Sequence, residues 1–248
     1  MNDLYVVGDV HGQYKELVFR ITQRYGIKDS HVLVLGDFGV GFDKTMPDLY
    51  KWSEKKLEDN NIEINVLRGN HDNPEYFDGE HDYPRLKFLK DHEIYNLANH
   101  DVYIIGGANS TDITYHDELG REKHRIEGKD WWAGENITRK TEDLPLKVDI
   151  IASHSAPLTF EPIPERKNQT SEEQYEKILG ERKYLDFILR EMNADYWYYG
   201  HYHTSFSGSY GNLLYRCMPP LEFFLVPEKK EHNPQGKEEN TDGLNRRI

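Results

Sequence analysis

The chain has 248 residues, of which 37% are hydrophobic and 30% are charged, a composition typical of a globular protein with one sizeable core. Its uninterrupted apolar runs, such as residues 102–105, are far shorter than the roughly 20 residues of a membrane-spanning helix, and this argues against an integral membrane protein. Asp and Glu outnumber Lys and Arg by 44 to 31, and the net charge of -13 argues against a broad surface for duplex nucleic acid or an anionic membrane.

The first 70 residues alternate short apolar runs with longer segments whose apolar residues recur at helical spacing. We predict strands at residues 4–7, 32–35 and 62–67. A first helix starts near Tyr14 and stops at Gly26, and Pro47 opens a second. Strands that alternate with helices predict parallel crossovers and an α/β fold.

The second half is richer in strands. We predict them at residues 94–97, 102–105, 148–152, 196–199, 213–217 and 221–226. The run from Ser171 to Gln174 resembles a capping box that opens a helix, with Gly180 as a candidate break. No repeat or flexible linker divides the chain, so we expect one domain over residues 1–227, followed by a polar, disordered tail at 228–248.

Cysteine content and the first residues bear on the cellular compartment. Cys217 is the only cysteine and cannot form a disulfide within the chain. Residues 1–3 lack the basic region of a secretory signal. Together these features favour a reducing, cytoplasmic setting.

Clusters of polar residues follow several predicted strands. They are Gly8-Asp9-Val10-His11-Gly12, Gly36-Asp37-Phe38-Gly39, Gly69-Asn70-His71-Asp72, Ala152-Ser153-His154 and Gly200-His201-Tyr202-His203. In an open α/β sheet the carboxyl ends of the strands form the edge where ligands bind, so we expect these clusters to meet. Their carboxylates, amide and imidazoles suit divalent metals such as Mn, Fe or Zn.

The donors exceed what one ion needs, and two ions would use them well. We assign Asp9, His11 and His203 to the first ion, and Asn70, His154 and His201 to the second, with Asp37 as the bridge. Such a pair of ions can hold a hydroxide and clamp phosphoryl oxygens during an in-line displacement. His71 is then left over as the general acid.

Each motif alone also has a structural explanation. A Gly-Asp after a strand is usually a turn, and a single Asp more often caps a helix than binds metal. His71 alone could be a polar residue with no catalytic role. Five clusters in matching positions favour the metal site over these explanations.

The ordered set Gly-Asp-Val-His-Gly, Gly-Asp, Gly-Asn-His-Asp, a later His and Gly-His-Tyr-His resembles the calcineurin-like metallophosphoesterase superfamily over about residues 5–205. The resemblance implies two mixed β-sheets packed as a sandwich and flanked by helices, a dinuclear metal centre, and hydrolysis of phosphoesters. It implies the same metal ligands as those assigned above.

Residues 106–112, Arg125-Ile126, Trp131-Trp132 and Glu135 resemble a set found in bacterial and phage members of that superfamily. The chain also departs from a family pattern. Protein phosphatases and dinucleoside tetraphosphatases of the superfamily carry an Asp and an Arg where this chain has Val40 and Gly41. The departure weakens the case for protein phosphatase activity and requires the phosphate to be held from elsewhere.

Arg125 is our candidate for that phosphate contact, because it lies in a polar, loop-like segment and its planar guanidinium suits a phosphoryl group. A solvated surface arginine is the alternative. Trp131 and Trp132 would either line the site or pack against other side chains, and packing is the default expectation for an aromatic pair. The remaining histidines are expected on the surface or in loops: His31, His81, His92, His100, His116, His124 and His232.

The resulting hypothesis is a metal-dependent phosphoesterase, with a phosphomonoesterase as first choice. Its substrate would be a phosphorylated small molecule, a nucleotide or a peptide. A phosphodiesterase or nuclease acting on small or single-stranded nucleic acid is the alternative. A non-catalytic scaffold with the same fold is a third reading, against which the complete ligand set argues.

Overall fold

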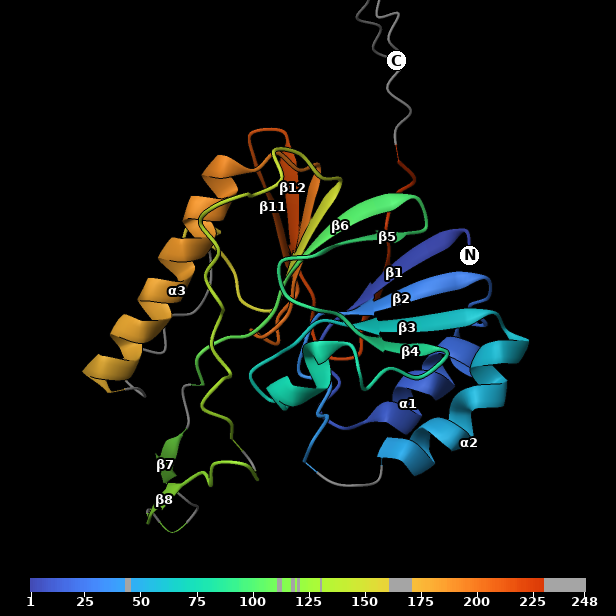
Figure 1. The fold of residues 1–248 in the computed structure, drawn as a ribbon, viewed down its shortest axis with the longest axis horizontal. Helices are drawn as coiled ribbons and strands as arrows, with labels where there is room; N and C mark the ends of the chain where they lie inside the picture. Colours follow the sequence, from blue (N-terminus) through green and yellow to red (C-terminus); the bar gives the residue numbers. More distant parts are fainter. Residues whose placement is uncertain are drawn as a thin grey trace, which may run out of the picture.

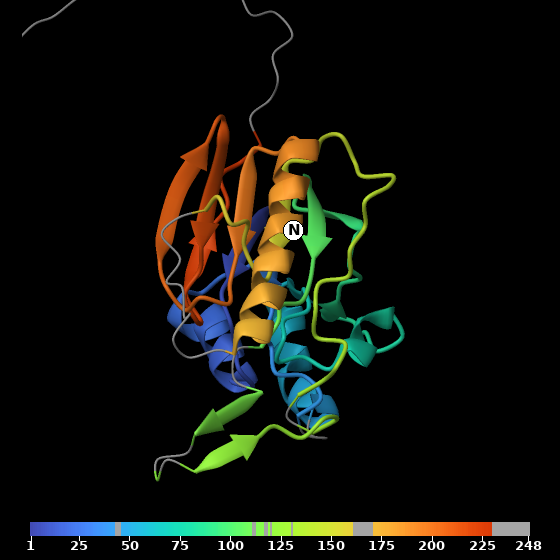
Figure 2. The same ribbon diagram turned by 90° about the vertical axis from the view of Figure 1, so that its left-hand side faces the viewer.

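The computed structural model describes residues 1–42, 46–110, 113–116, 119, 121–129, 131–160 and 171–229. Within them, two mixed β-sheets pack face to face with helices on their outer sides (Figure 1), which confirms the predicted architecture. Helices α1 (Tyr14–Phe19) and α2 (Met46–Asp59) cover one sheet, and α3 (Glu172–Glu191) covers the other (Figure 2).

The first sheet has the strand order β13-β1-β2-β3-β4. Its strands are β1 (Asp3–Val7), β2 (Ser30–Val34), β3 (Ile62–Val66), β4 (Leu86–Phe88) and β13 (Phe223–Leu225). Strands β1 to β4 run parallel, as the alternation of strands and helices predicts, and β13 pairs antiparallel with β1.

The second sheet has the order β11-β12-β10-β9-β6-β5. Its strands are β5 (Ile94–Leu97), β6 (His100–Ile105), β9 (Ile150–Ser153), β10 (Tyr196–Tyr199), β11 (Phe206–Tyr210) and β12 (Leu213–Cys217). The four central strands are parallel, whereas β5 and β11 are antiparallel at the edges. Strands β4 and β11 were not predicted from the sequence.

The helices of the first sheet are α1 (Tyr14–Phe19), which continues as the π-helix η1 (Arg20–Arg24), and α2 (Met46–Asp59). The predicted helix from Tyr14 therefore widens its turns after Phe19 rather than staying α-helical. A short 3₁₀ helix, η2 (Pro74–Asp78), follows β3.

Helix α3 (Glu172–Glu191) covers the second sheet without a break, so the candidate break at Gly180 is wrong. Ser171 Oγ accepts a hydrogen bond from Gln174 N, as the capping box predicts. The Gln174 side chain does not return to the cap; its Nε2 donates to the carbonyl of Ser110.

Alternation of side chains along the strands divides the core into layers. On β1, Leu4 and Val6 pack between the two sheets, whereas Val7 packs under the helices. Ile151 of β9 packs under α3, and its neighbour Ile150 packs between the sheets. Because a strand buried on both faces is apolar throughout, these strands read as continuous apolar runs in the sequence.

A small antiparallel hairpin of β7 (Thr114–His116) and β8 (Glu122–His124) extends away from the two sheets (Figures 1 and 2). It lies in the segment that the sequence predicts as a loop, so that prediction is wrong for these six residues. Residues 230–248 fall outside the described part of the chain, and the domain boundary at 227 therefore stays a prediction.

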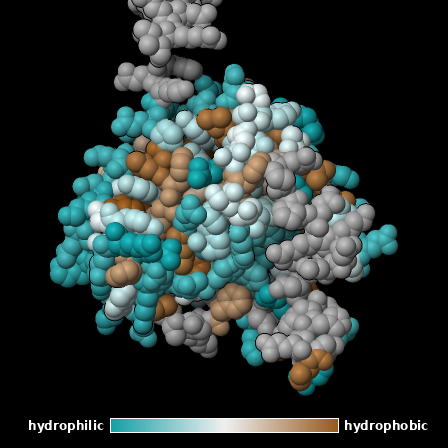
Figure 3. All heavy atoms as spheres, turned by 180° about the vertical axis from the view of Figure 1, so that it is seen from behind, coloured by the Kyte–Doolittle hydropathy of each residue, from teal (hydrophilic) through white to brown (hydrophobic). Residues whose placement is uncertain are grey.

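The face seen in Figure 3 is mostly hydrophilic, with apolar residues in small scattered patches. Among the described residues, no helix combines the length and the apolar character that crossing a membrane requires.

Candidate metal centre

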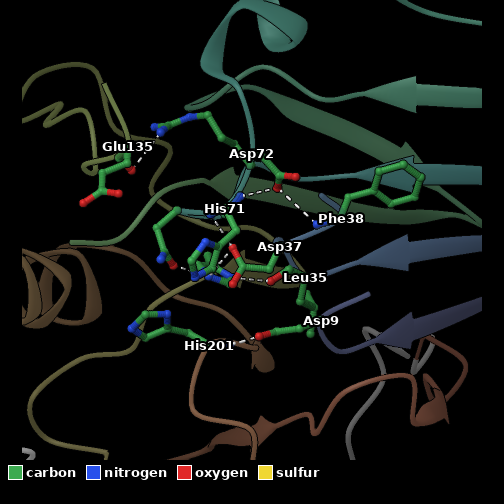
Figure 4. Close-up of polar contacts among 12 residues, drawn as sticks. Asp9, Leu35, Asp37, Phe38, His71, Asp72, Glu135 and His201 are labelled. Atoms are coloured by element: carbon green, nitrogen blue, oxygen red, sulfur yellow. Dashed lines mark hydrogen bonds and ion pairs between the residues drawn. The ribbon is translucent and has the colours of Figure 1, made fainter. Parts of the chain in front are cut away.

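The predicted ligand clusters meet where the two sheets come together at the carboxyl ends of their parallel strands. Asp9 follows β1 and Asp37 follows β2, while His201 follows β10 in the other sheet (Figure 4). The parallel strands of each sheet end at one edge, and the two edges adjoin. Asp9 and His201 are therefore close neighbours, and His201 N donates to Asp9 Oδ1 at 3.0 Å.

Four residues form the first group of candidate ligands. One nitrogen or oxygen from each of Asp9, His11, Asp37 and His203 lies within 4.8 Å of the others. His203 Nε2 is 2.8 Å from Asp9 Oδ2 and 2.9 Å from His11 Nε2. Three donor atoms therefore converge on one point.

A second group contains Asp37, His154 and His201, again with donor atoms within 4.8 Å of one another. His154 Nε2 lies 3.2 Å from Asp37 Oδ1 and 3.0 Å from Asn70 Oδ1. Asp37 belongs to both groups, which is the position that the sequence assigns to the bridge.

These residues fit a pair of divalent metal ions. Among the described residues, Asp9 Oδ2 is buried yet makes no well-oriented hydrogen bond, although two imidazole nitrogens face it. A shared cation would satisfy all three atoms at once. Nitrogen and oxygen donors in this mixture suit Mn, Fe or Zn.

The backbone is strained where ligands are attached. His11, Asp37, His201 and His203 have φ between 47° and 67°, in the left-handed region that side chains usually avoid. Such conformations cost about 1 to 3 kcal/mol each and persist where the surrounding structure imposes them, commonly at functional sites. Here they lie in the turns that follow β1, β2 and β10.

Close approach of the loops after β2 and β3 requires a glycine at position 69. A Cβ atom there would lie 2.1 Å from Asp37 N and 2.2 Å from Asp37 Oδ1. The glycine that precedes Asn70 in the motif thus allows Asp37 to sit against the loop that carries Asn70.

The carboxylates of the centre are held ionised. Burial alone would raise the pKa of Asp9, but the imidazoles of His11 and His203 outweigh it and lower this pKa to about 2. Burial also acts on Asp37, and the charge of His154 outweighs it, so the pKa of Asp37 lies well below its usual range. Both residues are therefore negatively charged and ready to bind cations.

The imidazoles of the second group differ from each other. Burial would lower the pKa of His154, but the nearby charge of Asp37 raises it to about 9. Burial lowers the pKa of His201 to about 3, which keeps that ring neutral. Only neutral imidazole binds a metal, so His154 must lose a proton when an ion binds, whereas His201 need not.

Asp72 organises the loops, a role that the sequence motif does not reveal. Its carboxylate is fully buried and accepts hydrogen bonds from the backbone N–H groups of Phe38, Gly39, Val40 and Gly69, at 2.7 to 3.2 Å. Burial and the charge of Asp37 raise the pKa of Asp72 to about 6. Asp72 therefore ties the loop that carries Asp37 to the loop that carries Asn70.

His71 and Arg125 lie together beside the candidate ligands. The His71 ring is 5.7 Å from the ring of His11, and its Nδ1 is 3.2 Å from Arg125 Nη1. His71 N donates to Asp37 Oδ1 at 2.7 Å, which anchors the loop. The structure thus brings the predicted general acid and the predicted phosphate-binding arginine into contact.

An aromatic pair lies next to His71. Phe42 is 39% exposed and its ring is 6.3 Å from the His71 ring. Trp132 is buried and meets Phe42 edge to face at 5.0 Å. Trp132 therefore packs, as is expected by default for an aromatic pair, and this packing supports Phe42 at the rim of the site.

The other candidate residues fall elsewhere. His100 is buried at the start of β6, which corrects its prediction as a surface or loop residue: the side chain is only 4% exposed. His31 belongs to β2 and lies beside Glu63. His232 and the side chain of His116 lie outside the described residues.

A family comparison covers the part of the chain that contains the candidate ligands. The sequence pattern of the calcineurin-like phosphoesterase family matches residues 3–205. A phosphopantetheinyl hydrolase from Mycobacterium tuberculosis is similar in structure, with 14% identity, 88% of this chain and 89% of that chain covered, and a TM-score of 0.45. A second solved structure has 10% identity, covers 91% and 98% of the two chains and has a TM-score of 0.49.

No curated protein sequence matches the chain significantly. The family match spans the strand-end clusters from Asp9 to His203 and most of both sheets. The chain belongs to the calcineurin-like phosphoesterase family.

Proposed function

We propose that the protein is a metal-dependent phosphomonoesterase with two divalent ions in the candidate centre. One observation carries the proposal: two groups of ligand atoms, each within 4.8 Å, share Asp37. Asp9, His11 and His203 would hold one ion, and Asn70, His154 and His201 the other. Bound ions of this kind supply an activated water and offset the negative charge of a phosphoryl group.

Arg125 would bind the phosphoryl oxygens. Its guanidinium reaches His71 Nδ1 and is only partly buried, so it can turn toward a ligand at the same place. A planar guanidinium can donate two parallel hydrogen bonds to a phosphoryl group. This arrangement would supply a contact that Val40 and Gly41 cannot make.

His71 would protonate the leaving oxygen. An imidazole that accepts from Arg125 at Nδ1 is neutral, with its proton on Nε2. When Arg125 turns to the phosphate, Nδ1 becomes able to take up a proton, and the charged ring can then give one to the leaving group. The substrate would thus draw Arg125 away and prepare the acid in the same movement.

The substrates we propose are phosphorylated small molecules or nucleotides, with phosphopeptides less well supported because Val40 and Gly41 replace the family's Asp and Arg. The net charge of -13 is consistent with small substrates. A phosphodiesterase is the competing activity. A panel of aryl phosphates, bis-aryl phosphates, nucleotides, phosphopeptides and oligonucleotides, tested with added Mn²⁺, would separate these classes.

The sharper test compares leaving groups in the wild type and in His71→Ala. An alkoxide needs a proton to leave, whereas a nitrophenolate hardly does. We expect His71→Ala to lower kcat by about 10²- to 10⁴-fold with an alkyl phosphate and far less with a nitrophenyl phosphate. Metal content, measured on the same samples, should stay at two ions.

His81→Ala is the matched control, because it removes an exposed imidazole that pairs with Asp78 away from the centre. It should leave all rates unchanged. Equal losses along the leaving-group series in His71→Ala would refute the acid role. A wild type that takes up fewer than two equivalents of Mn²⁺ or Fe²⁺ and hydrolyses nothing in the panel would support the scaffold reading instead.

A further inference from the structure

Asn70 can bind a metal ion only through its amide oxygen, so the orientation of the amide decides whether it is a ligand. Its Oδ1 lies 3.0 Å from His154 Nε2, on the side of the centre. Its Nδ2 points the other way and donates to Ser110 Oγ at 3.0 Å. Rotation of the amide by half a turn would place two N–H donors toward the ion.

Ser110 is itself held in one orientation by Glu135. The backbone N–H of Ser110 donates to Glu135 Oε1 at 2.7 Å, and its hydroxyl donates to Oε2 at 2.6 Å. A hydroxyl has only one hydrogen, so Ser110 Oγ can only accept from Asn70. The carboxylate thus determines the direction of the whole chain of hydrogen bonds.

The position of Glu135 is fixed relative to Asn70 through the backbone. Arg68, two residues before Asn70, donates to the carbonyls of Gly134, Glu135 and Asn136 at 2.9 Å each and pairs with Asp91 at 2.7 Å. Arg68 therefore serves the loop and is not available to a phosphate.

Gly107 completes the attachment of this loop. A Cβ at Gly107 would lie 2.5 Å from the carbonyl oxygen of Glu135, so only glycine allows the two segments to touch. Glu135 and Ser110 are both nearly inaccessible, at 2% exposure each. Water cannot readily replace either partner, because neither side chain is exposed to solvent.

We propose that Ser110 and Glu135 are positioning residues that hold the Asn70 amide with its oxygen toward the second metal ion. The assignment rests on the proposed function, since it presupposes that Asn70 is a ligand. Residues behind metal ligands typically contribute 10- to 100-fold to metal affinity.

The test is a Mn²⁺ titration of metal-free protein that resolves the dissociation constants of the two ions. At pH 8 Glu135, whose pKa burial raises to about 7, is ionised. We expect Ser110→Ala and Glu135→Gln to raise the Kd of one ion by about 10- to 100-fold and to leave the other within a few fold. Ser110→Thr keeps the hydroxyl and should restore most of the affinity.

Glu181→Gln is the matched control. Glu181 is a buried carboxylate that accepts from the backbone of Asn109 at 2.9 Å and of Ile137 at 3.2 Å, so it joins the same two segments without touching Asn70. It should lower thermal stability as Glu135→Gln does and leave both ion affinities unchanged. A role in holding the loop alone would give all three variants the same loss of affinity.

The outcomes separate this assignment from the proposed function. If the wild type binds two ions and both Ser110→Ala and Glu135→Gln bind them as tightly, the positioning role is wrong and the proposed function stands. Equal losses in the Glu181→Gln control would also overturn it. A wild type that binds no metal would overturn the proposed function and this assignment together.

Discussion

The substitution Asp37→Asn tests the centre at the residue shared by both groups of ligands. Asp37→Asn keeps the size of the side chain and removes its charge. A neutral amide is a poor bridge between two dications, so we expect metal content to fall from two ions to one or none. Activity with every substrate should fall with it.

The same variant has an effect on the metal-free protein that can be worked from the structure. Burial by itself would lower the pKa of His154. The Asp37 carboxylate, 3.2 Å from His154 Nε2, contributes most to raising this pKa from 6.5 to about 9. A raised pKa stabilises the folded state below pH 6.5, and this stability is lost as the pH rises through about 9. At pH 7 the contribution is about 2 to 3 kcal/mol. Asp37→Asn should remove most of it, while the charge of Asp9 and the carbonyl of Leu35, which also raise this pKa, remain.

Elemental analysis gives the number of ions, and urea denaturation of metal-free samples at pH 7 gives the free energy of unfolding. Asp149→Asn is the matched control. Asp149 is buried and pairs with Lys229 at 2.7 Å outside the candidate ligand groups, so the net charge changes equally while the metal content should not. Two ions retained in Asp37→Asn would refute the bridge, and an unchanged free energy of unfolding would refute the coupling to His154.

Three further outcomes are expected. Arg125→Ala should lower kcat/KM by about 10- to 100-fold, because it removes charged hydrogen bonds to phosphate, and should leave the metal content normal. Unchanged steady-state kinetics would show that Arg125 is a surface residue that does not bind phosphate. Because the pKa of His154 is about 9, Mn²⁺ binding at pH 7 should release a proton. Titration calorimetry measures this release as a binding heat that varies with the ionisation enthalpy of the buffer. A binding heat that is the same in all buffers would contradict the prediction. Gly69→Ala should abolish metal binding, because the added Cβ would lie 2.1 Å from Asp37 N. Gly134→Ala is the control: its added Cβ would have its nearest contact at 3.4 Å, so this variant should still bind two ions. Elemental analysis measures the metal content of both variants.

Most of the strands and the clusters of candidate ligands could be predicted from the sequence alone. A strand that is buried on both faces forms a continuous apolar run, such as residues 32–35. Such a run can be recognised in the sequence before the fold is known. Asp9, Asp37 and Asn70 come directly after such runs, and parallel strands end at one edge. Local periodicity together with this rule was therefore enough to place them at one site.

Other features left no local signal. Strand β11, Phe206–Tyr210, contains Ser207, Gly208 and Ser209, and its antiparallel pairing with β12 makes it a strand. His100 is buried at the start of β6, where Asp149 and Lys229 from distant parts of the chain line the same hollow, a neighbourhood that the sequence around it does not show. The continuity of α3 through Gly180 likewise depends on the apolar side chains that anchor it to the second sheet.

The α/β class, the set of candidate ligands and His71 as the candidate acid could be predicted from short motifs, because each motif consists of residues a few positions apart. The residues that orient those ligands became known from the packing of the folded chain. Ser110 contacts Asn70 from 40 positions away, Arg125 contacts His71 from 54, and Arg68 bonds to the loop at 134–136. Such contacts depend on how the two sheets and their loops pack together, and no spacing along the chain encodes them.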